Sequence, residues 1–516
     1  MNSAAPQSLG EPSPRDSDSI DVRSRLTKGS AWIAGGRLAV NALGLLSTLL
    51  LARLLTPDDF GLVAIATSIL AIIASATELS LGQALIQHRN PTVDHFHATW
   101  TLQAGRNLIL ALGFAVAAVP VAAAFHEPRL TPLMLVLAVG VFVQGLTNPR
   151  SIMMTRDLIF WQQFMLQVGT KVVGLIVSLI VAFVYRSYWA LVWGTVASQF
   201  ATVLLSYCVL PFLPRPRLRG ARELFRFSIW LTLGQLINTV NWRADHLFIG
   251  GYLGPATLGY YTQGDSLASM PTREVSSPLT QTLFPAFARF ADTKDQLPGV
   301  YQRAQALVTA ITLPAGVGTA LIAHPLVLLV LGAKWEPAVI VIEILAAAFA
   351  FQVMGALCEP LAMATGNTKL LFWRDLQGFF IRLPTIAIGM LLGGLVGVLY
   401  ARALTGSISI ALHMNVVRRV SGLSFLDQLK VNFRAIASVA AMSGVVAFLN
   451  WIHGPADLSK AALAERVALL IGVGAVIYTG TMASLWQIAG RPEGPETEIL
   501  TMARKVLAKF GLGRSA

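Results

Sequence analysis

The sequence contains little cysteine and little charge. Its 516 residues include only two cysteines, Cys208 and Cys358. Both lie inside apolar stretches, so we expect small buried side chains rather than a disulfide framework. Charged residues make up 13% of the chain, whereas about a quarter of residues are charged in an ordinary soluble protein. These two shortages exclude a disulfide-stapled secreted domain and a soluble globular protein.

Motifs for nucleotide or metal chemistry are also missing. The sequence has no G-x-x-x-x-G-K-[ST] loop, so we do not expect this chain to use ATP on its own. Its eight histidines are scattered and do not have the spacing of metal ligands. We therefore expect no cofactor, no metal site and no enzyme activity.

Long apolar segments recur along almost the whole chain. About 20 apolar residues are enough to cross a hydrocarbon core as a helix. The pattern predicts an all-α membrane protein with about fourteen transmembrane helices, near residues 31–54, 60–80, 98–125, 132–153, 162–185, 188–211, 224–250, 256–288, 305–331, 337–363, 369–392, 394–417, 432–451 and 463–488.

Basic residues are distributed unevenly between the loops. The formal net charge is +13, and most lysines and arginines lie in the two tails and in alternate loops, above all in the run RPRLRGARELFR that begins at Arg215. By the positive-inside rule, this distribution predicts that both termini are cytoplasmic. This arrangement favours contact with anionic membrane lipids over nucleic acid.

A short motif occurs twice, which predicts an internal repeat. Leu55-Thr-Pro-Asp-Asp-Phe-Gly61 and Leu253-Gly-Pro-Ala-Thr-Leu-Gly259 begin 198 positions apart (253 − 55), each between an outgoing and a returning helix. Two six-helix lobes with the same orientation follow as a parallel repeat. The predicted organisation is a disordered cytoplasmic tail (1–30), a first lobe (31–211), a basic cytoplasmic linker (212–223), a second lobe (224–418), two extra C-terminal spans (432–488) and a cytoplasmic tail (489–516).

Several stretches resemble the oligosaccharide flippases, which are Wzx-type polysaccharide exporters of the multidrug/oligosaccharidyl-lipid/polysaccharide superfamily. They are LLARLLTPDDFGLVAIATSILAII with ELSLGQALIQ, DHLFIGGYLGPATLGYYTQGDSLASMP, LTQTLFPAFARFAD and LVLLVLGAKWEPAVIVIEILA. The resemblance covers residues 28 to 420. It implies alternating-access transfer of undecaprenyl-pyrophosphate-linked oligosaccharide repeat units across a bacterial inner membrane, for exopolysaccharide, capsule or O-antigen synthesis.

The predicted first lobe contains three intramembrane cations, Arg37, Arg106 and Lys171, against one acid, Glu78. On the predicted topology, all four lie toward the cytoplasmic ends of their spans. The cations could bind the pyrophosphate of the lipid-linked substrate, or they could reach to the interface and lock helices together. Asn41 follows Arg37 by one helical turn and is expected to line the same cavity.

The predicted second lobe contains more acids than bases. The expected cavity lining is polar and comes from two spans: Asn238, Asn241, Arg243, Asp265 and Arg273. The candidates for binding a coupling H⁺ or Na⁺ are the carboxylates Asp245, Glu343, Glu359 and Asp375. The same charges could instead form interhelical pairs, such as Asp265 with Arg243.

Two other functions remain as alternatives. An ion-coupled multidrug antiporter of the same superfamily would not need the cations of the first lobe. A membrane-embedded polysaccharide polymerase would need a larger water-facing loop than the stretch IHGPADLSKAA offers. The expected partners are a lipid-linked oligosaccharide, a coupling ion, membrane lipids and, downstream, a polysaccharide polymerase with its export machinery.

Overall fold

The computed structural model describes residues 35–78, 92–156, 160–218, 229–291, 295–453, 459–492 and 494–498, with single residues 85, 293 and 501. Within these ranges the chain is helical and contains no strand. Among the described residues, ten helices are long and apolar enough to cross a membrane. The fold is therefore an all-α membrane protein, as predicted. The predicted N-terminal tail, part of the basic linker and most of the predicted C-terminal tail lie outside the described residues.

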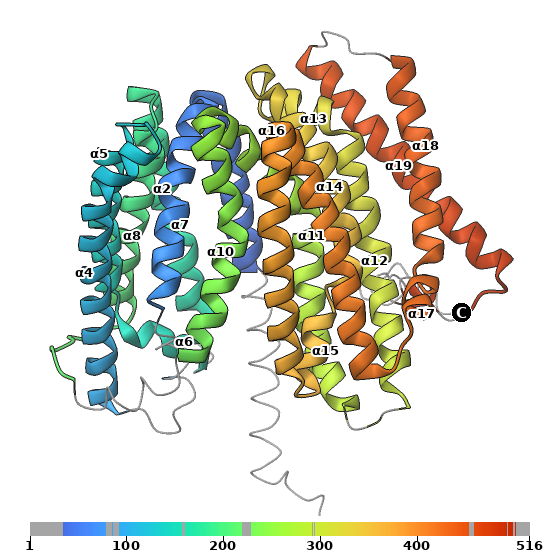
Figure 1. Cartoon of the computed structure of the whole chain (residues 1–516), viewed down its shortest axis with the longest axis horizontal. Coiled ribbons are helices and arrows are strands. Elements are labelled where there is room, and N and C mark those ends of the chain that lie inside the picture. The colour runs from blue at the N-terminus through green and yellow to red at the C-terminus, as the bar shows by residue number, and fades with distance from the viewer. Residues whose placement is uncertain are drawn as a thin grey trace, which may run out of the picture. The chain divides into compact units, whose positions relative to one another are not determined.

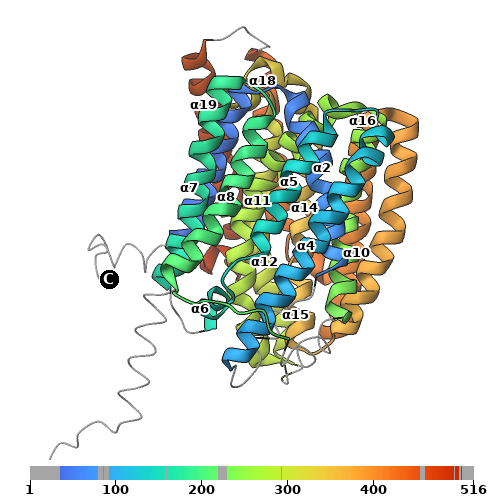
Figure 2. The same cartoon turned by 90° about the vertical axis from the view of Figure 1, so that its left-hand side faces the viewer.

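The first compact unit comprises residues 1–55 and 73–233. It contains the helix Gly35–Leu54, α4 (Val93–Ala124), α5 (Leu130–Gly145), η1 (Pro149–Ile152), α6 (Met153–Arg156), α7 (Phe160–Tyr185) and α8 (Trp189–Val209). Helix α4 packs on α5, α5 on α8, and α8 on α7 (Figure 2). Gly174 and Gly194 allow α7 and α8 to approach closely, because a Cβ on Gly194 would lie 1.7 Å from the Ser178 hydroxyl.

The second compact unit comprises residues 56–72 and 234–516. Its elements are α2 (Pro57–Ala76, of which 73–76 belong to the first unit), α10 (Ile229–Tyr252, of which 229–233 belong to the first unit), α11 (Gly254–Phe290), α12 (Leu297–Leu321), α13 (Ala323–Val330), η2 (Ala333–Ala338), α14 (Val339–Gln352), η3 (Val353–Gly355), α15 (Cys358–Ala364), α16 (Thr368–Ser421), α17 (Phe425–Lys430), α18 (Phe433–His453) and α19 (Lys460–Ile488) (Figure 1). Helix α14 packs against α11, α12 and α16. The predicted lobe boundaries remain a prediction, although residues 56–72 group with the second unit.

Two predicted spans are divided in the structure, and two others form one kinked helix. Helix α16 is two helices joined at Gly393 and Gly394, whose backbone angles are not helical, which agrees with the separate spans predicted near 369–392 and 394–417. The span predicted at 305–331 is α12 followed by α13. The span predicted at 337–363 is interrupted by η3, where Gly355 packs against His413. The exact number of membrane crossings remains a prediction.

The two copies of the repeated motif contact each other within the second unit. A Cβ on Gly61 would lie 1.6 Å from the Pro255 carbonyl oxygen, and a Cβ on Gly259 would lie 1.8 Å from the Pro57 carbonyl oxygen. The contacts are reciprocal because Pro57 and Pro255, like Gly61 and Gly259, are 198 positions apart. Such i-to-j and j-to-i contacts are what a local two-fold axis produces. Only glycine fits at either position.

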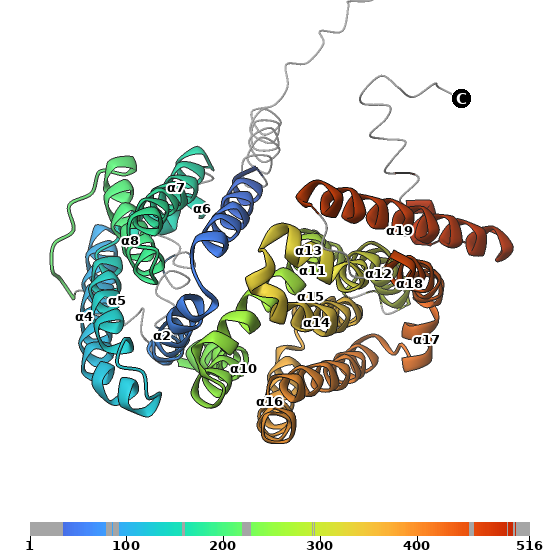
Figure 3. The ribbon, with the colours of Figure 1, turned by 90° about the horizontal axis from the view of Figure 1, so that it is seen from above.

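Helices α18 and α19 pack together and cover the flank formed by α12 and α13 (Figure 3). Their shared core includes Leu313, Met442 and Val446, and the Tyr478 hydroxyl donates a 2.7 Å hydrogen bond to the Ala310 carbonyl. Large apolar side chains such as Val116 and Leu392 remain uncovered by protein, at 78% and 84% exposure. This outward apolar surface is suited to lipid.

Candidate functional site

The first unit brings two of the predicted cations onto neighbouring helices. The helix Gly35–Leu54 packs on α7 at Gly36, where a Cβ would lie 3.2 Å from the Phe164 ring. Arg37 follows Gly36 directly and is exposed, and Asn41 is half-buried. Lys171 is exposed and lies on the Phe164 face of α7, about 10 Å further along the helix. Two of the predicted cations, Arg37 and Lys171, are therefore exposed on adjacent helices.

Arg106, the third predicted cation, binds the end of α2. Its Nη2 donates to the Ala74 carbonyl at 2.7 Å and lies 3.5 Å from Glu78 Oε2, while its Nε donates to the Thr77 hydroxyl at 3.3 Å. The carbonyls at a helix C-terminus lack intrahelical partners, so a guanidinium there satisfies them and complements the helix dipole. These contacts hold the Arg106 guanidinium at the end of α2, and its role in binding pyrophosphate stays a prediction.

A buried network of charged side chains forms the centre of the second unit. Asp245 on α10 is 1% exposed, and its Oδ2 accepts from Arg382 Nη2 at 2.7 Å and from the Tyr261 hydroxyl at 2.9 Å. Arg402 Nε lies 3.4 Å from the same oxygen. Both arginines come from α16, one from each of its two helices. The network therefore joins α10 and α11 to both halves of α16.

Asp265 pairs with Arg402, not with Arg243. Arg402 Nη1 donates to Asp265 Oδ1 and to the Tyr261 hydroxyl, each at 2.5 Å. The sequence suggested an interhelical pair of Asp265 with Arg243. That pairing was wrong, because the cation that pairs with Asp265 is Arg402. Two carboxylates, Asp245 and Asp265, face two guanidinium groups, Arg382 and Arg402, so the formal charge of the network is zero.

The remaining predicted residues of the second unit are spread over several helices. Asn238 is exposed on α10, and Arg243 is half-buried on the same helix. Arg273 on α11 lies 3.5 Å from Glu274 and is 65% exposed. Asp375 is paired with Arg374 at 2.7 Å. Glu343 on α14 and Glu359 on α15 are exposed and form no ion pair with the described residues.

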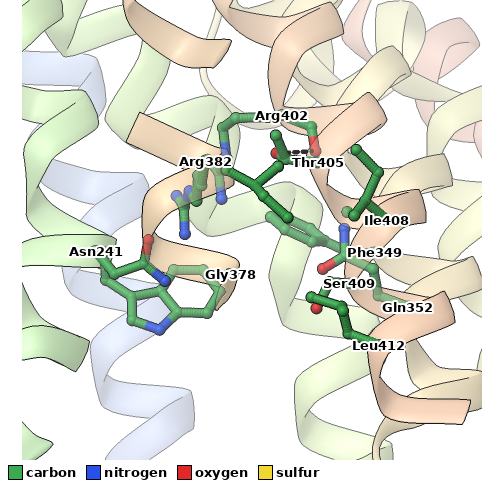
Figure 4. Close-up of a pocket in the computed structure, with 13 residues that line it drawn as sticks. Asn241, Phe349, Gln352, Gly378, Arg382, Arg402, Thr405, Ile408, Ser409 and Leu412 are labelled. Atoms are coloured by element: carbon green, nitrogen blue, oxygen red, sulfur yellow. Dashed lines mark hydrogen bonds between the residues drawn. The ribbon is translucent and has the colours of Figure 1, made fainter. Parts of the chain in front are cut away.

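A cavity of about 100 Å³ adjoins the buried network (Figure 4). Its wall comes from α10, α14 and both halves of α16: Asn241, Trp242, Phe349, Gln352, Gly378, Ile381, Arg382, Arg402, Thr405, Gly406, Ile408, Ser409 and Leu412. The two guanidinium groups stack on aromatic rings, Arg382 over Trp242 at 4.8 Å and Arg402 over Phe349 at 5.2 Å. Of the predicted cavity-lining residues, only Asn241 lines this cavity.

Few features of the sequence indicated the residues that build this site. Arg382 and Arg402 stood out only as arginines inside apolar spans, and neither has an acidic residue one helical turn away that would reveal its partner. Tyr261, Trp242 and Gln352 carried no signal, because single polar or aromatic residues are common in membrane helices. Their grouping depends on contacts between residues up to 157 positions apart, the separation of Asp245 and Arg402 (402 − 245).

Comparisons with known proteins agree with this architecture. Residues 50–340 match the model of a family described as polysaccharide biosynthesis protein. The chain is 23% identical over 456 residues to the succinoglycan biosynthesis transport protein ExoT of Rhizobium meliloti (strain 1021), which covers 88% of this chain and 92% of ExoT. It is 23% identical over 385 residues to the lipopolysaccharide biosynthesis protein WzxC of Escherichia coli (strain K12), covering 73% and 78% of the two chains.

Solved structures share the fold at low identity. The lipid II flippase MurJ in an inward closed conformation superimposes with a TM-score of 0.71 and 12% identity, over 88% of this chain and 99% of that chain. An inward-facing multidrug resistance transporter of the MATE family superimposes with a TM-score of 0.58 and 14% identity, over 75% and 96%. The family match covers more than half of the chain and agrees with the fold, so this multi-pass membrane protein belongs to the polysaccharide biosynthesis protein family.

Proposed function

We propose that this protein is a flippase that moves lipid-linked oligosaccharide repeat units across the membrane for export. The observation that carries the proposal is the family match at residues 50–340, joined to near full-length similarity to a protein named for succinoglycan transport. The likeness to the lipid II flippase supports the fold that such transport uses. The function is therefore transport rather than catalysis.

The proposed carrier is undecaprenyl pyrophosphate, in a bacterial inner membrane with both termini of the protein in the cytoplasm. The excess of basic residues in the tails and in alternate loops supports this orientation. Arg37 and Lys171 are the proposed pyrophosphate ligands, because both are uncovered by protein on adjacent helices. Arginine offers a bidentate fork and lysine a point charge. Arg106 is proposed to act indirectly, by holding the end of α2.

Coupling to an ion gradient is a further part of the proposal. Asp245 and Asp375 are each paired with arginine, so a bound H⁺ or Na⁺ is not needed to neutralise them. Glu343 and Glu359 are the better candidates for binding a coupling ion, since they form no ion pair with the described residues. A polysaccharide polymerase, followed by export machinery, would consume the transported units.

The proposal is tested by deleting the gene for this protein in its host. We expect export of the polysaccharide to stop and lipid-linked repeat units to accumulate in the inner leaflet. Export that continues without any second flippase would contradict the proposal.

Complementation of the deletion strain then tests the two proposed pyrophosphate ligands, Arg37 and Lys171. Arg37→Ala and Lys171→Ala should fail to restore export, and Arg37→Lys should restore it partly, because lysine loses the bidentate contact. Arg53→Ala, at the other end of the same helix, is the matched control.

The multidrug antiporter is the weaker candidate. The MATE transporter shares the fold, but at 14% identity that likeness carries no substrate information. A drug antiporter would change the resistance of the host to cationic drugs. We expect the deletion strain and its parent to tolerate such drugs equally.

A further inference from the structure

We propose that the cavity of the second unit binds one sugar ring of the transported oligosaccharide. This inference rests on the proposed function, and it adds a second contact point to the pyrophosphate ligands of the first unit. It is carried by three features of the cavity, namely its unused hydrogen-bonding groups, its balanced charge and its aromatic surface.

Two amide side chains in the cavity wall have no hydrogen-bond partner among the described residues. The Asn241 Oδ1 atom is buried without one. Gln352 packs against Gly406: a Cβ on Gly406 would lie 2.2 Å from the side-chain amide nitrogen of Gln352. A buried polar atom without a partner is costly, and a ligand can supply the missing bond. A carboxamide offers both donors and an acceptor, which suits the hydroxyl groups around a sugar ring.

The balanced charge of the network favours a neutral ligand. Arg382 and Arg402 line the cavity, but each is neutralised, by Asp245 at 2.7 Å and by Asp265 at 2.5 Å. A dianionic pyrophosphate would have to compete with these carboxylates and would be repelled by them. A neutral polyol needs only the N–H groups that still face the cavity. In Figure 4 Arg382 and Arg402 lie together, with Asn241 on one side and Phe349, Gln352 and Ser409 on the other.

Aromatic side chains supply the apolar surface that a pyranose needs for its C–H face. Trp242 is 50% exposed, and Phe349 also lines the cavity. Ligand sites are commonly apolar walls with a few placed polar groups, and drug-sized sites occupy about 300–1,000 Å³. The present cavity, at about 100 Å³, is smaller. It fits a subsite for one ring rather than for a whole oligosaccharide.

A glycine in the wall allows the cavity to be filled without disturbing the packing. Gly378 on α16 has open space where a Cβ would point, so Gly378→Leu should occupy the subsite. Gly480 on α19 has the same open space but lies outside the cavity, which makes Gly480→Leu the matched control. Gln352→Ala is a second variant that removes an amide and adds no bulk. Trp242→Leu and Trp373→Leu form another matched pair, because both indoles are 50% exposed.

The first experiment measures binding of two lipids to the purified full-length protein. One is undecaprenyl pyrophosphate without sugar, and the other is the oligosaccharide-bearing pool extracted from the deletion strain. Gly378→Leu, Gln352→Ala and Trp242→Leu should weaken binding of the sugar-bearing lipid by about tenfold. They should leave binding of the sugar-free lipid unchanged, and the two control variants should match wild type for both. An equal loss for both lipids would overturn the inference.

A second experiment separates this inference from the proposed function. Glucose, galactose and N-acetylglucosamine are each titrated into the protein and followed by saturation-transfer NMR, and binding of inorganic pyrophosphate, which has no C–H protons, is followed by ³¹P line broadening. Binding of at least one sugar, weakened in Gly378→Leu but not in Gly480→Leu, supports the subsite even if the deletion strain accumulates no lipid-linked sugar. Absence of binding by all three sugars would overturn it. So would binding of pyrophosphate alone that Gly378→Leu abolishes, because the cavity would then be an anion site.

Discussion

Two carboxylate–guanidinium pairs in this protein have the same separation and very different surroundings. Asp245 and Arg382, in the second unit, are 2.7 Å apart, with side chains that are 1% and 11% exposed. Glu127 and Arg129, in the loop between α4 and α5 of the first unit, are also 2.7 Å apart but are 16% and 41% exposed. Distance alone would predict that the two ion pairs contribute equally to stability. Burial separates them, because an unpaired charge is far more costly where water cannot reach it.

The comparison extends to the function of each unit. The buried charges of the second unit form ion pairs with one another. These pairs hold the helices together and leave a cavity of zero formal charge beside them. The first unit leaves Arg37 and Lys171 uncovered by protein. An exposed cation can be reached by a phosphate, whereas a cation buried against a carboxylate cannot. Burial therefore decides what the cations of each unit can do.

The largest expected effect comes from breaking the buried pair. Asp245→Asn leaves Arg382 and Arg402 facing only one carboxylate, Asp265. Removing one partner of a buried pair costs about 3–5 kcal/mol, so the purified variant should unfold at a clearly lower temperature in detergent. A double variant with Arg382→Gln should recover part of the loss, because it removes the orphaned charge.

Asp375→Asn is the control for that measurement. Asp375 also pairs with an arginine at 2.7 Å, but its side chain is 56% exposed. Its loss should change the free energy of unfolding by less than about 1 kcal/mol. Equal losses in Asp245→Asn and Asp375→Asn would refute the claim that burial separates the pairs.

The sequence predicted the fold better than it predicted the pairing. Apolar length and loop charge are local properties, so helices were expected where they occur, and the boundary predicted between 369–392 and 394–417 coincides with the kink of α16 at Gly393 and Gly394. The breaks at η3 and between α12 and α13 were missed. They depend on packing, such as Gly355 against His413, that no window of sequence contains.

The sequence predicted which kinds of residue form the candidate site, but not which of them contact each other. Asp245 and Asp265 were expected to be important, but their partners on α16 were not assigned, because facing helices and their rotation cannot be read from one sequence. Arg106 was grouped with Arg37 for the same reason. All three predicted cations of the first unit looked alike as intramembrane charges, and only the contact of Arg106 with Ala74 and Thr77 separates it.

An intermediate effect is expected for Arg106→Ala. Its side chain is 18% exposed, and its guanidinium donates to the Ala74 carbonyl and the Thr77 hydroxyl. Hydrogen bonds to charged groups contribute about 1.5–3 kcal/mol, so thermal unfolding should show a loss of that size. Arg37→Ala should change stability by less than about 0.5 kcal/mol, as surface changes usually do. A stable Arg106→Ala variant that no longer binds undecaprenyl pyrophosphate would instead make Arg106 a direct ligand.

The smallest expected effect comes from the exposed pair and depends on pH. The hydrogen bond from Arg129 lowers the pKa of Glu127 below its usual value. A carboxyl whose folded pKa is lowered stabilises the protein above its unfolded pKa, about 4.3, and this contribution is lost as pH falls through the lower folded pKa. Glu127→Gln should therefore cost about 0.2–1 kcal/mol at pH 7. The difference from wild type, followed by thermal unfolding at decreasing pH, should shrink below about pH 4. A difference that stays constant at every pH would mean that packing of the side chain, and not its charge, sets the contribution of Glu127.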